Sequence, residues 1–190
     1  MLKQMSKRTT TDGRQAMCVL YDEADVQRYV RRLARKVHLH YAGEPFTMVG
    51  ILHACAPFMF DLMRSLPYPV REQVRYDFFM ATSRDGTKCT GVVKIAEPSK
   101  FDLKGRNILV VEGIVATGLT LSEVLPRLEK RRPKSIKVCA LLDKPEVRDE
   151  RFRDIRVDFC GTVAPPEFVV GYGFDLDNEY RGLPYIATIK

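Results

Sequence analysis

The sequence predicts an α/β fold built on a largely parallel central sheet. Three apolar stretches have the composition of buried strands, namely Phe46–Leu52 (FTMVGIL), Asn107–Val111 (NILVV) and Ile136–Leu142 (IKVCALL). Segments with helical periodicity lie between them, and strands that alternate with helices are typical of a parallel sheet flanked by helices. A chain of 190 residues can bury one such core, so we expect a single domain over residues 16–190.

The first helix is predicted over Asp25–Val37, because four apolar residues recur there at helical spacing. These residues are Val26, Val30, Leu33 and Val37. Further along we expect, in chain order, a helix at Pro57–Arg64, a strand at Val74–Met80, a polar loop at Thr82–Thr90 and a short strand at Gly91–Ile95. Short strands and turns are expected over Phe168–Ile189.

A second amphipathic helix is predicted directly after Thr120. Its apolar stripe consists of Leu121, Val124, Leu125 and Leu128. Thr120 and Glu123 have the spacing of a capping box, which predicts that the helix begins there. Pro126 lies inside this helix and predicts a kink.

The chain carries a net positive charge, with 31 Lys and Arg against 24 Asp and Glu. Such a charge favours anionic partners, which include phosphates, acidic proteins and RNA. Basic residues gather in residues 28–36, 130–137 and 148–156, so contact with RNA is expected to be electrostatic. No apolar stretch approaches the roughly 18 residues of a membrane span, and we expect no membrane partner.

The five cysteines are widely spaced and odd in number, which argues against a disulfide framework or a zinc site. They favour a reducing compartment, so we expect an intracellular protein, cytoplasmic or mitochondrial, that is not secreted. Residues 1–15 are basic and rich in hydroxyl side chains. We expect them to form a flexible tail, and a mitochondrial presequence is the open alternative.

The segment Ile108–Thr120 (ILVVEGIVATGLT) runs from a buried strand through a short loop into the start of a helix. Ligands bind at the carboxyl ends of strands in such sheets, which places this loop at the ligand edge. Hydroxyls and close backbone approach at Thr117, Gly118 and Thr120 suit a phosphate. Glu112, an acid after four apolar residues, is hard to explain as structure alone. The segment resembles the phosphoribosyl pyrophosphate loop of type I phosphoribosyltransferases.

The resemblance extends from about Val19 to Lys190 and points to the hypoxanthine-guanine phosphoribosyltransferases. Three further motifs carry it: LLDKPEVR (141–148), EFVVGYGFD (167–175) and NEYRGLPYI (178–186). It implies the type I phosphoribosyltransferase fold with a small hood region, and self-association into an oligomer. Phosphoribosyl pyrophosphate or a purine nucleotide would be the ligand, and Mg²⁺ the cofactor of an active enzyme.

The resemblance also implies a role for each matching residue. The phosphoribosyl group would be held by Glu112, Thr117, Gly118 and Thr120. The purine would contact Lys144, Phe168 as a stacking ring and the backbone of Val169. The pyrophosphate side would include His53, Ala54, Ser83, Arg84 and Arg181, with Asp175 as an acid beside the metal.

Several of these residues also have purely structural interpretations, which stay open at this point. Phe168 and Val169 suit a buried strand, and Lys144 before a proline suits an exposed turn. Asp175 and Arg181 suit an ion pair with each other.

The sequence departs from the family pattern at four places in the catalytic region. Gly113 stands where the family has a second acid, and Ala116 where it has the Asp that accepts a proton from the purine. His53-Ala54 replaces Lys-Gly, whose peptide bond we expect to be cis from the resemblance. In the mobile lid, Arg84-Asp85 replaces Tyr-Gly.

These departures favour a catalytically degenerate homologue without a confident catalytic residue. Such a protein would serve as a nucleotide-binding, regulatory or structural subunit, with an active paralogue or a large complex as its partner. The first alternative is an active purine-salvage enzyme that transfers ribose-5-phosphate from phosphoribosyl pyrophosphate to hypoxanthine, guanine or xanthine. The second alternative is an RNA-contacting component of a ribonucleoprotein particle.

Overall fold

The computed structural model describes residues 17–85, 88–96 and 102–189, with side chains described outside 82–101. A six-stranded sheet has the order β4-β3-β2-β5-β6-β7, in which all neighbours are parallel except the antiparallel pair β3 and β4. Its strands, in chain order, are β2 (Phe46–Leu52), β3 (Arg75–Asp85), β4 (Lys88–Ala96), β5 (Asn107–Val115), β6 (Ser135–Asp143) and β7 (Phe159–Val163). The predicted α/β class with a largely parallel sheet is confirmed.

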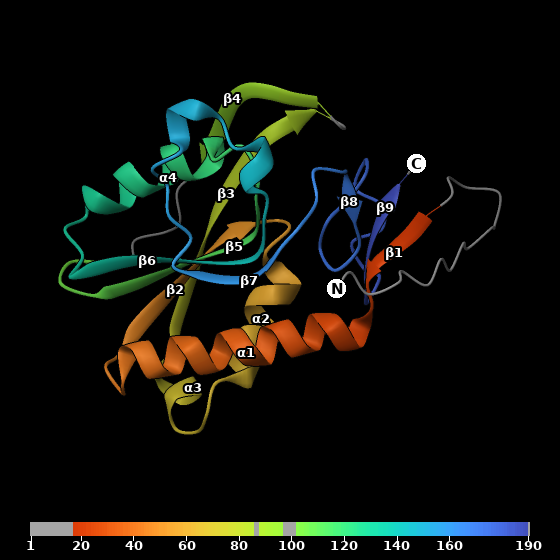
Figure 1. Cartoon of the computed structure of the whole chain (residues 1–190). Coiled ribbons are helices and arrows are strands. Elements are labelled where there is room, and N and C mark those ends of the chain that lie inside the picture. Colours follow the sequence, from red (N-terminus) through yellow and green to blue (C-terminus); the bar gives the residue numbers. More distant parts are fainter. Residues whose placement is uncertain (1–16, 86–87, 97–101, 190) are drawn as a thin grey trace.

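Helices cover both faces of this sheet (Figure 1). The helices are α1 (Glu23–Tyr41), α2 (Ala56–Ser65), the short α3 (Val70–Gln73) and α4 (Leu119–Glu129). α1 and α2 pack against each other on one face, and α4 lies on the opposite face near β3 and β4. Two 3-10 turns, Pro145–Val147 and Glu150–Phe152, follow β6.

A second, smaller sheet lies beside the carboxyl ends of the main strands (Figure 1). It consists of β1 (Met17–Tyr21), β9 (Ile186–Ile189) and β8 (Val169–Val170), paired antiparallel in the order β1-β9-β8. Met17 pairs with Ile189, so the two ends of the described chain meet in one sheet. This sheet corresponds to the expected small hood region.

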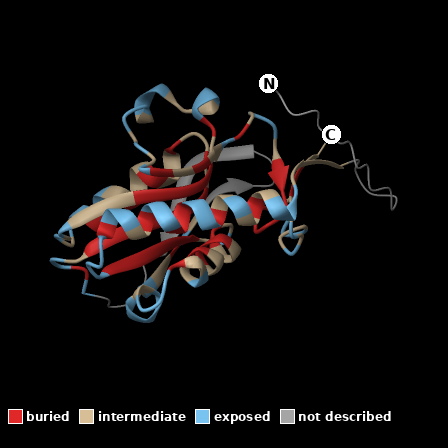
Figure 2. Ribbon diagram, turned by 60° about the horizontal axis from the view of Figure 1, so that its bottom comes forward, coloured by how far each residue is buried: buried red, intermediate tan, exposed pale blue. Residues whose placement is uncertain are grey.

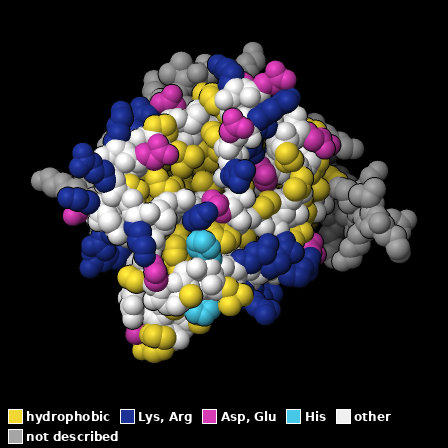
Figure 3. All heavy atoms as spheres, turned by 60° about the vertical axis from the view of Figure 1, so that its left-hand side comes forward, with side chains coloured by type: hydrophobic (Ala, Val, Ile, Leu, Met, Phe, Trp, Pro, Cys, Tyr) yellow, Lys and Arg dark blue, Asp and Glu magenta, His cyan; other side chains and the backbone are white. Residues whose placement is uncertain are grey.

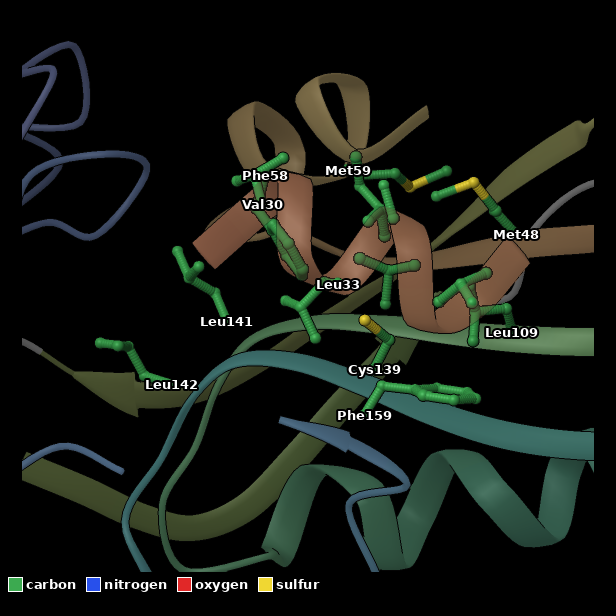
Figure 4. Packing of buried hydrophobic residues seen from close by; sticks show 14 of the residues in the cluster. Val30, Leu33, Met48, Phe58, Met59, Leu109, Cys139, Leu141, Leu142 and Phe159 are labelled. Carbon is green, nitrogen blue, oxygen red and sulfur yellow. The ribbon is translucent and has the colours of Figure 1, made fainter. Parts of the chain in front are cut away.

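Two hydrophobic clusters lie on the two faces of the sheet. Alternate residues of β5 divide between them, since Leu109 and Val111 face α1 and α2 whereas Ile108 and Val110 face α4. This alternation is what a pleated strand that is buried on both faces must show. Figure 4 shows how Val30 and Leu33 from α1 approach the sheet in the first cluster.

Helix α1 follows from its apolar stripe and its end residues. The four apolar residues predicted on one face are all buried, and Figure 2 shows this stripe beside an exposed polar face. The helix begins after Asp22, whose carboxylate accepts a hydrogen bond from the amide of Asp25 at 2.8 Å. It ends at Ala42 in a left-handed conformation, so it is longer than the predicted Asp25–Val37.

Two local predictions are wrong. The expected polar loop at Thr82–Thr90 is mostly strand, because β3 continues to Asp85 and β4 begins at Lys88. The expected capping box is absent, because α4 begins after Gly118, and the first amide of the helix, Leu119 N, donates to Thr117 Oγ1 at 3.4 Å. Residues 1–15 lie outside the described residues, so their predicted flexibility stays a prediction. In the described part of the chain, no helix combines the length and the apolar character that crossing a membrane requires.

Candidate active site

A cleft of about 530 Å³ opens at the carboxyl ends of β2 and β5, beside the small sheet. This is the edge at which ligands bind in open α/β sheets. Segments far apart in the sequence contribute its walls. The predicted site residues among those that line it are His53, Ala54, Glu112, Ala116, Thr117, Gly118, Thr120, Phe168, Asp175 and Arg181.

Glu112 is the acid at the floor of the cleft. It lies in β5 with only 7% of its surface exposed, and its Oε1 accepts a hydrogen bond from the amide of Gly113 at 2.9 Å. Burial raises the pKa of this carboxyl to about 8, against its ordinary value of 4.5. Glu112 therefore holds its proton near neutral pH when the cleft contains no charged ligand.

The loop between β5 and α4 has the geometry of an anion site. Gly118 occupies the left-handed region with φ of 89°, and α4 begins at the next residue. The first amides of a helix have no partner within the helix, and the helix dipole favours a negative charge there. The first turn of α4 contains no acidic residue that would oppose such a charge.

Asp175 and Arg181 form the wall on the side of the small sheet. Arg181 Nη2 lies 2.9 Å from Asp175 Oδ1, and Arg181 Nη1 donates to the carbonyl of Gly173 at 2.7 Å. The alternative of a mutual ion pair is thus confirmed, and both side chains still line the cleft. Sequence reasoning missed Asp177 and Asn178, which also line it. Both have positive φ, a conformation in which Asp and Asn are enriched.

Of the residues expected to contact the purine, one lines the cleft and the others are buried. Phe168 is half-buried and lines the cleft, whereas Val169 lies in β8 with a buried side chain. Lys144 is only 5% exposed, so its alternative interpretation as an exposed turn cation is wrong. Its Nζ donates to the carbonyl of Glu167, beside Phe168, and lies 3.5 Å from that of Pro166.

The segment that follows β2 contains a cis peptide bond between Leu52 and His53. The expected position was the next bond, His53–Ala54, so this prediction is wrong by one residue. Ser83 and Arg84 belong to β3, but their side chains lie outside those described. Their predicted contact with pyrophosphate stays a prediction.

Gly113, one of the four departures, lies where space is short. A Cβ there would come within 3.0 Å of the Phe174 ring and 3.2 Å of the Ala54 carbonyl oxygen. A Cβ on Gly173, whose φ is 96°, would come within 2.3 Å of the same carbonyl oxygen. The segment after β2 therefore packs closely against both glycines.

Residues 20–176 match the family described as "Phosphoribosyl transferase domain". Together with the cleft at the strand ends, this match decides the family. The chain belongs to the phosphoribosyltransferase family. It is 37% identical over 172 residues to the hypoxanthine-guanine-xanthine phosphoribosyltransferase of Tritrichomonas foetus, which covers 90% of this chain and 91% of that protein.

Two further relatives place this chain in the hypoxanthine-guanine phosphoribosyltransferase family. The hypoxanthine-guanine phosphoribosyltransferase of Staphylococcus aureus (strain N315) is 36% identical over 173 residues, which are 90% of this chain and 93% of that protein. The crystal structure of a hypoxanthine-guanine phosphoribosyltransferase from Bacillus anthracis superposes with a TM-score of 0.79 at 34% identity. That match covers 90% of this chain and 97% of the other.

These relatives correct the preferred functional hypothesis. The sequence departures favoured a catalytically degenerate subunit of a larger assembly. The phosphoribosyltransferases of T. foetus and S. aureus match this chain over nine-tenths of its length, and both are named as enzymes. The hypothesis of a degenerate homologue is therefore wrong as the main interpretation, and the alternative of a purine-salvage enzyme is favoured.

Proposed function

We propose that this phosphoribosyltransferase is an active purine-salvage enzyme. It would transfer ribose-5-phosphate from phosphoribosyl pyrophosphate to hypoxanthine, guanine or xanthine and release pyrophosphate. The observation that carries this proposal is the single cleft in which the β5–α4 loop, Glu112, Phe168 and Arg181 come together. An anion site, an acid, an aromatic ring and a cation are the groups that such a substrate pair requires.

The phosphate and ribose would bind at the floor of the cleft. The amides at the start of α4, with the hydroxyls of Thr117 and Thr120, suit the 5′-phosphate. Glu112 lines the same cleft as that loop and the end of β2, and its carboxyl group suits the hydroxyls of the ribose. The purine would stack on Phe168, with the backbone of Val169 and the ammonium of Lys144 behind that ring.

Mg²⁺ is typical of phosphoribosyltransferases, and the cleft has a donor set that fits it. The described residues contain no group of three or more His, Cys, Asp and Glu arranged to hold a metal. Mg²⁺ does not need one, because it binds through one or two carboxylates, water and substrate phosphates. Asp175 and Asp177, both in the cleft, would supply those carboxylates. The bound ion would neutralise charge on the leaving pyrophosphate.

The proton of the purine has no acceptor at position 116, because alanine cannot titrate. Asp143, a second acid near the strand ends, is held by Arg148, and the cleft lining does not include it. We propose that Glu112 or a water molecule accepts the proton, and that positioning and electrostatics provide most of the rate. With Glu112 as the acceptor, the rate would rise with pH towards about 8, because only the ionised carboxylate can take a proton.

The test is turnover by the purified chain with phosphoribosyl pyrophosphate, Mg²⁺ and each purine, with nucleotide product quantified by chromatography. We expect product with at least one purine, its loss on chelation and a large decrease in the Phe168→Ala variant. Leu39→Ala is the matched control, because Leu39 is exposed and distant from the cleft. Ala116→Asp restores an acid and is expected to raise kcat, since general-base catalysis contributes about 10²–10⁴ in rate.

Absence of turnover in the unmutated chain with every purine would refute this proposal. Product formed only by Ala116→Asp would have the same meaning, because the natural chain would then lack the activity.

Self-association, RNA contact and a cytoplasmic or mitochondrial location stay predictions. Figure 3 shows Lys and Arg side chains over much of one face, with acidic side chains among them. Many described basic residues are paired: Arg28 with Asp25, Arg127 with Glu123, Lys134 with Glu44, Lys137 with Asp158 and Arg153 with Glu150. Such pairing reduces the charge available to RNA, and any RNA contact would weaken steeply with salt.

A further inference from the structure

The carbonyl side of the β5–α4 loop is held by a single segment of the chain. Residues 144–149 donate to three successive carbonyls, at the last residue of β5 (115) and at residues 116 and 117 of the loop. The bonds are Lys144 N to Val115 O at 2.9 Å, Arg148 Nε to Ala116 O at 2.9 Å and Asp149 N to Thr117 O at 3.1 Å. With the carbonyls engaged behind the loop, fewer partial negative charges face the cleft where a phosphate would bind.

The middle bond is the only one of these three that a side chain supplies. Arg148 has a side chain that is only 8% exposed, and each arm of its guanidinium has a partner. Nε binds the Ala116 carbonyl, Nη1 donates to the Ile155 carbonyl at 3.1 Å, and Nη2 pairs with the Asp143 carboxylate. Three fixed partners determine both the position and the plane of this group.

The stem of Arg148 also shapes the loop. A Cβ on Gly118 would come within 3.1 Å of Arg148 Cδ and 2.9 Å of Phe152 Cβ. Gly118 has the left-handed conformation that starts α4, so the arginine packs directly behind the turn. Arg148 is not among the cleft-lining residues, and Asp143 balances its charge.

We propose that Arg148 is a positioning residue for the phosphate of the substrate. It acts through the Ala116 carbonyl, and Asp143 fixes its guanidinium. The proposal rests on the proposed function, since it assigns the loop to the 5′-phosphate. Because Arg148 does not reach the cleft, its loss should weaken the binding of phosphate-bearing ligands and leave the binding of the purine unchanged.

The experiment compares Arg148→Gln and Arg148→Lys with Arg153→Gln. Arg153 lies five residues further on with its side chain 68% exposed and paired with Glu150, which makes it a matched control. For each variant, KM is measured for phosphoribosyl pyrophosphate and for hypoxanthine. Calorimetry gives the affinities for guanosine 5′-monophosphate and for guanosine, which differ only by the phosphate.

We expect Arg148→Gln to raise KM for phosphoribosyl pyrophosphate by about tenfold or more, since misplacing a binding group by 1 Å can cost about 100-fold. The affinity for guanosine monophosphate should fall by a similar factor. KM for hypoxanthine and the affinity for guanosine should change less than about twofold. Arg148→Lys should have a smaller effect in the same direction, because lysine keeps the positive charge but lacks the planar guanidinium with its several fixed N–H donors. Arg153→Gln should match the unmutated protein.

Equal losses for guanosine monophosphate and guanosine would overturn the proposal, because they would indicate general damage. No change in either Arg148 variant would also overturn it. If Arg148→Gln does not fold, Arg148→Lys decides. The same two comparisons are then made: KM for phosphoribosyl pyrophosphate against KM for hypoxanthine, and affinity for guanosine monophosphate against affinity for guanosine. An unmutated chain that neither turns over nor binds guanosine monophosphate overturns the proposed function and this inference together. An active chain whose Arg148 variants behave like Arg153→Gln overturns this inference alone.

Discussion

Replacing Glu112 by Gln should change how the stability of the protein depends on pH. Glu112 is buried, and its pKa in the folded state is about 8 against an ordinary value of 4.5. Gln has nearly the same shape as protonated Glu and cannot ionise. Between pH 4.5 and 8 the folded protein keeps a proton that the unfolded chain releases, so the stability provided by the neutral carboxyl is lost as pH rises through this window.

The magnitude follows from the two pKa values. Each pH unit of difference corresponds to about 1.4 kcal/mol, so the full window amounts to as much as about 5 kcal/mol. The Glu112→Gln variant should therefore match the unmutated protein near pH 4.5. Above pH 8 it should be more stable by up to that amount.

Urea denaturation followed by circular dichroism at pH 5, 6, 7, 8 and 9 measures this difference. Each pair of curves is compared at the same pH, so that other titrating groups cancel. A difference that stays constant across the range would refute the reasoning, because it would mean that Glu112 ionises in the folded protein as it does in the unfolded chain. A difference that grows as pH falls would contradict its sign.

Three further predictions test the packing. Gly173→Ala should destabilise the fold by about 2 kcal/mol or more in urea denaturation, because its Cβ would meet a carbonyl oxygen and its φ is 96°. Leu33→Ala should lower the free energy of unfolding by about 2–5 kcal/mol. Leu39→Ala, at an exposed position, should change it by no more than about 0.5 kcal/mol. Equal losses would contradict the assignment of Leu33 to the core. Gly113→Asp should lower the thermal midpoint more than Ala116→Asp, since a side chain at position 113 would meet the Phe174 ring and the Ala54 carbonyl, whereas residue 116 lines the cleft. The reverse order would be inconsistent with the structure.

The central strands could be predicted because their signal is local. Phe46–Leu52 is apolar except for Thr47, and the structure gives β2 those same bounds. The antiparallel pair β3 and β4 was partly missed, because its outer half is polar and is formed by pairing at the sheet edge. β1 was missed for a related reason, since its partner Ile189 is far away in the sequence.

The site shows the same division between local and distant information. The β5–α4 loop is contiguous, so its hydroxyls, glycine and preceding acid were recognised from the sequence. The contact between Arg148 and the Ala116 carbonyl joins two segments 32 residues apart and depends on how β5 and β6 pair. No spacing rule in one sequence predicts that contact. The burial that raises the pKa of Glu112 likewise depends on segments that the sequence does not place beside it.

The departures from the family pattern are connected through packing. Gly113 leaves space for the Phe174 ring and the Ala54 carbonyl, and Gly173 also packs closely against that carbonyl. Residue 113 therefore cannot be treated as an acid that was merely lost, because a side chain there would displace the segment after β2. Ala116 differs, since its carbonyl accepts a hydrogen bond from Arg148 Nε and the residue lines the cleft. The two positions thus have different structural constraints, and only residue 116 could regain an acid without repacking the site.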